Sequence, residues 1–108
     1  MRAVTYDRFG GADVLELSTR EAAEPQAGEV RVRIVVSAVN PTDWKQRDGR
    51  GQSGPTEAEV VPNQDGAGVV DAVGPGVTEL QVGDRVWLIL AGAYKPNAGT
   101  AQEYTVLP

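Results

Sequence analysis

The most regular pattern of apolar and polar positions lies in the segment "EVRVRIVVSAV". Apolar side chains occupy every second position from Val30 to Ala38, and arginine, valine or serine stands between them. A period of two predicts a β-strand with one apolar face. The segments "RAVTY", "GAGVVDAVG" and "AQEYTVLP" are typical of further strands, and "RVWLIL" is expected to be a strand buried on both faces.

Turn-forming residues separate these runs, with 13 glycines and 7 prolines along the chain. The segment "TDWKQRDG" predicts one short helical turn, capped by Thr42 or Asp43 and ended by Gly49. Residues 48–65 lack periodicity and are expected to form a long loop. Trp44 and Trp87 are expected in the core or in a pocket wall. About seven short strands with at most one short helix indicate a mainly β fold, a barrel or a sandwich.

Composition narrows the classes of function. The 108 residues fit one domain, and the net charge of -5 comes without any cluster of basic side chains, which argues against a nucleic-acid partner. The longest apolar stretch, "VWLILAGA", is far shorter than the ~20 residues of a membrane span. A soluble, cytoplasmic protein with no membrane partner is therefore the expectation.

The chain contains no cysteine and no histidine. Because zinc sites in proteins are built mainly from thiolate and imidazole groups, no ordinary zinc site is expected. A serine or cysteine nucleophile activated by histidine is excluded for the same reason. An acid–base step would have to use a carboxylate, lysine, tyrosine or a water molecule.

Four segments, "FGGADVLEL", "GEVRVRIVVSAVNPTDWKQRDG", "DGAGVVDAVGPGVTELQVGDRV" and "AQEYTVLP", occur in an order that resembles the medium-chain dehydrogenase/reductase superfamily. They are most similar to its zinc-independent quinone oxidoreductase (zeta-crystallin-like) branch. The resemblance implies a GroES-like fold, a partly open β-barrel, over residues 1–108, as the N-terminal part of a catalytic domain. The family's Rossmann domain is not expected within residues 1–108, since no G-x-G-x-x-G stands between a strand and a helix there. Alone, the chain is expected to be inactive.

The resemblance also implies a site. Zinc-dependent relatives carry a cysteine ligand where Asn40 stands and a histidine ligand where Gln64 stands, so amides replace both metal ligands. Asn40 would orient the nicotinamide or the substrate carbonyl, and Thr42 would relay a proton. Pro41, Lys45 and Gln64 would contact the cofactor together with Asn40, which gives Asn40 and Thr42 as catalytic candidates. The plain alternatives are that Asn40-Pro41 is only a turn pair and Thr42 only a cap.

The function implied is hydride transfer from NADPH to quinones, enones or similar carbonyl compounds, as part of a longer protein and with a homodimer as one option. The proton would come from water or through Thr42. Two alternatives remain open. One is a non-enzymatic GroES-like module for binding or assembly, and the other is an enoyl-reductase domain of a larger synthase.

Overall fold

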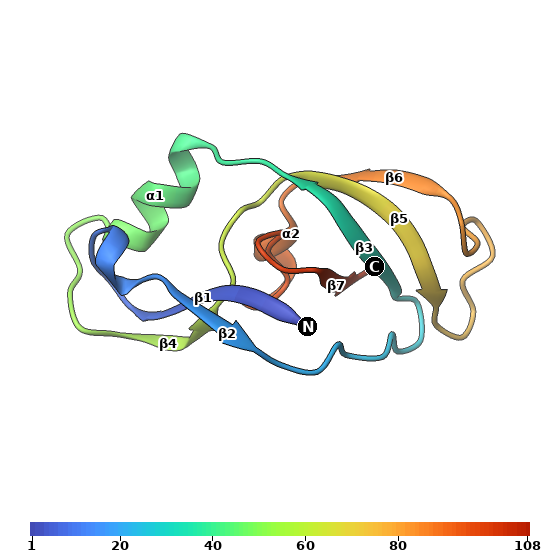
Figure 1. The fold of residues 1–108 in the computed structure, drawn as a ribbon, viewed down its shortest axis with the longest axis horizontal. Helices are drawn as coiled ribbons and strands as arrows, with labels where there is room; N and C mark the ends of the chain where they lie inside the picture. Colours follow the sequence, from blue (N-terminus) through green and yellow to red (C-terminus); the bar gives the residue numbers. More distant parts are fainter.

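The computed structural model describes residues 1–108 as two antiparallel sheets, drawn in Figure 1. The first sheet has the order β2-β1-β4, from strands β1 (Arg2–Arg8), β2 (Glu16–Thr19) and β4 (Pro55–Val60). The second has the order β6-β5-β3-β7, from strands β3 (Val30–Ser37), β5 (Gly66–Val73), β6 (Arg85–Leu88) and β7 (Tyr104–Leu107). Helix α1 (Pro41–Asp48) lies at one end of the elongated molecule, beyond the β4 end of the first sheet. The mainly β, partly open architecture is confirmed, and the sheets do not close into a barrel.

The core lies on the second sheet, where the alternating segment forms β3. Val30 and Val32 of β3 pack with Val70 of β5 and Leu88 of β6. The alternation ends early, because the β3–β5 register shifts between Ile34 and Val36. Val36 is consequently exposed, although the two-residue period places it on the buried face.

Gly68 explains why β3 and β5 can pair so closely at this shift. A Cβ atom at Gly68 would lie 2.1 Å from the carbonyl oxygen of Arg33. The close backbone approach that a glycine in a strand indicates is therefore present here. The sheet that leads into the site depends on this position having no side chain.

The prediction that "RVWLIL" forms a strand buried on both faces is wrong. Strand β6 ends at Leu88 and pairs only with β5, and its side chains alternate between an exposed face, with Arg85 and Trp87, and a covered face with Leu88. Trp87 is 82% exposed, and Ile89 and Leu90 are also exposed. Trp44, on α1, is 48% exposed, so of the two places expected for the tryptophans, the core is wrong for both.

Residues 48–65 are not one long loop, because they contain β4. This strand pairs with β1 at only two positions, Tyr6 with Val60 and Arg8 with Pro55, and the register shifts between them. The polar side chains Thr56, Glu57 and Glu59 do not alternate regularly with its apolar ones, which hides it from a search for alternation. A second short helix, α2 (Ala91–Tyr94), forms in the predicted loop "AGAYKPNAGT", and a 3-10 turn, η1, spans Ala12–Val14.

Candidate functional site

Helix α1 begins directly after β3, and Asn40 is its N-cap residue. The backbone of Asn40 is extended, and its N–H donates to Oδ2 of Asp43 at 2.6 Å. The prediction that Thr42 or Asp43 occupies the cap position is therefore wrong, although Asp43 does bond the capping residue's backbone. Gly49 ends the helix with a φ of 89°, as predicted.

Asp43 brings the two amide residues together. Its side chain is 5% exposed, and its second oxygen, Oδ1, accepts the backbone N–H of Gln64 at 3.2 Å. One carboxylate thus joins the start of α1 to the loop between β4 and β5. The side chain of Asn40 adds a second link, because its Nδ2 donates to Oδ2 of Asp65 at 2.8 Å.

Hydrogen-bonded hydroxyl groups of Thr100 and Ser37 hold the loop between β4 and β5 in place. The Thr100 hydroxyl, fully buried, donates to the backbone oxygen of Asp65 at 2.8 Å and lies 2.7 Å from the Ser37 hydroxyl. Ser37 in turn accepts from Nδ2 of Asn63 at 2.9 Å. Asn63 has a φ of 76°, a region that asparagine tolerates better than most residues. The position of Gln64 is therefore fixed by hydrogen bonds on both sides.

The other three predicted residues lie on the outside of α1. Pro41 occupies the first helical position, where its missing N–H costs nothing, and both Pro41 and Thr42 are exposed. Lys45 is exposed too, and its Nζ lies 5.8 Å from the centre of the Trp44 ring. The structure therefore brings Asn40 and Gln64 together and places Thr42 and Lys45 on the solvent side of the same helix.

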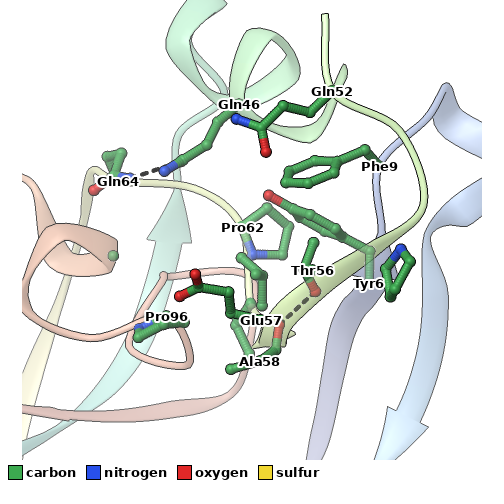
Figure 2. Close-up of a pocket in the computed structure, with 14 residues that line it drawn as sticks. Tyr6, Phe9, Gln46, Gln52, Thr56, Glu57, Ala58, Pro62, Gln64 and Pro96 are labelled. Carbon is green, nitrogen blue, oxygen red and sulfur yellow. Dashed lines mark hydrogen bonds between the residues drawn. The ribbon is translucent and has the colours of Figure 1, made fainter. Parts of the chain in front are cut away.

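A cavity of about 300 Å³ lies between α1, β1, β4 and the loop that carries Gln64, and Figure 2 shows its walls. Gln64 is the one predicted site residue that lines it, and Nε2 of Gln64 donates to Oε1 of Gln46 at 3.3 Å. Sequence reasoning missed the remaining walls, which include Tyr6, Phe9, Gln46, Gln52 and Glu57. Spacing gave a signal for Gln46 alone, since it stands three residues after Asp43 and therefore near the same face of the helix.

The hydroxyl of Tyr6 and the amide of Gln64 set the hydrogen-bonding character of the cavity. Burial raises the pKa of the Tyr6 hydroxyl; nearby Arg47 acts in the opposite direction and Asp43 adds to the increase. Tyr6 is therefore protonated at neutral pH. Oε1 of Gln64 is buried and has no hydrogen-bond partner.

The donor set can be tested against the groups that the resemblance implies. No cluster of three or more histidine, cysteine, aspartate or glutamate side chains that could hold a metal ion is present. The unpaired Gln64 oxygen is an acceptor for an N–H donor, which fits a neutral carboxamide such as that of nicotinamide.

None of the helices has the length and apolar character needed to cross a membrane.

The fold is that of a GroES-like β domain in which one carboxylate, Asp43, holds the backbones of Asn40 and Gln64. Comparison with known sequences agrees: the profile of the family "Alcohol dehydrogenase GroES-like domain" matches residues 26–108. The chain belongs to this family, within the medium-chain dehydrogenase/reductase superfamily. The resemblance read from the sequence segments is therefore confirmed.

Several individual relatives of the chain are oxidoreductases. It is 38% identical over 88 residues to the NADPH-dependent alkenal/one oxidoreductase of Arabidopsis thaliana, covering 81% of this chain and 23% of that protein. It is 32% identical over 108 residues to the quinone oxidoreductase of Rattus norvegicus, covering 97% of this chain and 32% of the relative. A mycobacterial protein solved in complex with NADPH is 31% identical, with a TM-score of 0.78 over 100% of this chain and 31% of that one. The chain thus spans less than a third of the length of these proteins.

Proposed function

We propose that this chain supplies part of the active site of an NADPH-dependent reductase that transfers hydride to quinones, enones or similar carbonyl compounds. The observation that carries the proposal is that Asp43 holds Asn40 and Gln64 together. The family resemblance implies that these two positions correspond to metal ligands of zinc-dependent relatives. Amides orient neutral carbonyl and carboxamide groups by hydrogen bonds and do not require a metal. The similarity to an alkenal/one oxidoreductase and a quinone oxidoreductase supports the same chemistry.

Each site residue has a distinct part in this proposal. A bound reduced nicotinamide supplies the hydride. Asn40 and Gln64 orient the nicotinamide carboxamide and the acceptor, Pro41 fixes the turn into α1, and the exposed Lys45 contacts the nucleotide. Thr42 is exposed on the first turn of α1, where it can pass a proton from solvent.

The dinucleotide needs more protein than these residues provide. Its pyrophosphate is held, in this proposal, by a Rossmann domain in the longer protein, with residues 1–108 as the GroES-like domain. The greater length of the relatives supports this arrangement. The proposed enzyme is cytoplasmic, needs no zinc and pairs into a homodimer.

The test compares two variants in the protein extended through its natural downstream sequence. Asn40→Ser keeps a favourable N-cap residue but removes the amide, whereas Asn97→Ser changes an exposed asparagine away from α1. We expect Asn40→Ser to lower kcat/KM for NADPH-dependent reduction of 1,4-naphthoquinone by about 10- to 100-fold. Asn97→Ser should leave it unchanged.

An NADPH titration followed by fluorescence provides the second readout. Binding by the extended protein, together with weak or no binding by residues 1–108 alone, supports the proposal. If the extended protein binds no NADPH and reduces no quinone or enone, the enzyme assignment fails. The non-enzymatic binding module then takes its place.

A further inference from the structure

Tyr6 is nearly completely buried, yet its hydroxyl group has no partner in the chain. The side chain is 3% exposed and lies near the end of β1, where it pairs with Val60 of β4. Its hydroxyl makes no hydrogen bond, and none contributes to its raised pKa. Figure 2 shows the hydroxyl oxygen directed toward the middle of the cavity. The hydroxyl lines the cavity and no hydrogen bond within the chain occupies it, so it is free to bond a ligand atom there.

The Tyr6 hydroxyl can act only as a donor or a neutral acceptor at neutral pH. Burial of the side chain raises its pKa, which keeps the proton on the oxygen. A phenol O–H is a strong donor to a carbonyl oxygen. The Tyr6 hydroxyl donates this proton to no other group of the chain, so it is available to a ligand.

The remaining walls select the kind of ligand. Figure 2 shows the ring of Phe9 close to that of Tyr6 on one side and the hydrogen-bonded pair Gln46 and Gln64 on the other. Of the residues that line the cavity, Glu57 is the single charged one, and no lysine or arginine lines it. An anionic ligand would lack a cationic partner and would meet this carboxylate. A neutral, flat molecule with one polar end fits aromatic rings on one side and amides on the other.

We infer that this cavity binds the neutral conjugated carbonyl acceptor and that the Tyr6 hydroxyl donates a hydrogen bond to its carbonyl oxygen. The inference rests on the proposed function and adds a donor that the paired amides do not provide. Hydride delivery to the conjugated carbon places negative charge on the carbonyl oxygen, and a preorganised donor stabilises that charge. The hydride's electron pair reduces the acceptor and oxidises the nicotinamide, solvent supplies the proton, and Tyr6 keeps its own.

The experiment removes only the hydroxyl group. Tyr6→Phe retains the ring that packs in the wall, and Tyr104→Phe makes the same change in a tyrosine on β7, outside the cavity. In the extended protein, kcat/KM for NADPH-dependent reduction of 2-cyclohexen-1-one should fall by about 10- to 100-fold for Tyr6→Phe. It should remain at the unaltered value for Tyr104→Phe.

A second readout needs neither the nucleotide nor turnover. Cyclohexenone labelled with ¹³C at its carbonyl is added to the extended protein, and the carbonyl resonance of the bound form is measured. A hydrogen bond polarises the carbonyl and moves its resonance downfield, so the shift should be present in the unaltered protein and in Tyr104→Phe, and reduced in Tyr6→Phe. A change in packing alone would not remove it.

The outcomes separate the inference from the function on which it rests. If Tyr6→Phe keeps full activity, or if the unaltered protein produces no downfield shift, the role of Tyr6 is overturned while reductase activity stands. If no variant reduces any acceptor but the shift depends on Tyr6, the proposed reductase function fails and the carbonyl site remains. If Tyr6→Phe does not fold, a missing downfield shift in the unaltered protein still overturns the role of Tyr6.

Discussion

Replacing Asp43 by alanine tests the link between the two halves of the site. The carboxylate is buried and accepts the backbone N–H groups of Asn40 at 2.6 Å and Gln64 at 3.2 Å. A hydrogen bond to a charged group contributes roughly 1.5–3 kcal/mol to stability, and the longer bond belongs at the low end. Partial access of solvent to the helix start reduces the sum. We expect the free energy of unfolding to fall by about 3 kcal/mol, which lowers the melting temperature by roughly 12–24 °C.

The assay is urea unfolding followed by circular dichroism, with the midpoint and slope fitted separately. Asp48→Ala is the matched control, because Asp48 is an exposed aspartate on the same helix without a side-chain hydrogen bond. It should stay within about 0.5 kcal/mol of the unaltered protein. A loss of less than about 1 kcal/mol for Asp43→Ala would refute the idea that this carboxylate holds the two segments together.

Two other positions give sharp expectations. Gly68→Ala should lower the free energy of unfolding by more than about 3 kcal/mol or prevent folding, because the new Cβ would lie 2.1 Å from the Arg33 carbonyl oxygen. Thermal melting checks this. Gly11→Ala is the control, because only a side-chain atom lies near that position. Equal melting of the two variants would contradict it. The pKa of Glu29 is held below its usual value, chiefly by a hydrogen bond from the Tyr94 hydroxyl. Its stabilising contribution is therefore present above the unfolded pKa and is lost as the pH falls through the folded pKa. The stability difference between the unaltered protein and Glu29→Gln, measured by thermal unfolding from about pH 7 to pH 2, should shrink toward acid, and a constant difference would rule the contribution out.

The sequence predicted the parts of the fold that depend on local pattern. Strand β3 was found because its alternating side chains meet the core on one face. Strand β4 was missed because its strand form depends on pairing with β1, far away in the chain. The exposure of Trp87 was missed for a related reason: an apolar run does not show that one face of its strand is left uncovered.

The candidate site was predictable to a similar extent. The family resemblance pointed to Asn40 and Gln64. In the structure the backbone N–H groups of both residues donate to the carboxylate of Asp43. That shared partner could not be read from the sequence, because an aspartate in a first helical turn normally serves its own helix. Tyr6 was missed because it lies on β1 of the first sheet, far in the chain from Asn40 and Gln64. Only the tertiary fold shows that it lines the cavity and that its hydroxyl is unpaired.

The two sides of the cavity differ in how firmly they are held. Asp43 and the hydroxyl groups beneath Asp65 fix the amide side, whereas β4 pairs with β1 at only two positions. The β4 side can therefore yield to a bulky acceptor while the distance between Asn40 and Gln64 stays constant. If the cavity holds the acceptor as proposed, it would admit molecules of different sizes while the amides keep one orientation toward the hydride donor. The range of acceptor sizes would then depend on the β4 side of the cavity, and the orientation of the acceptor on the amide side.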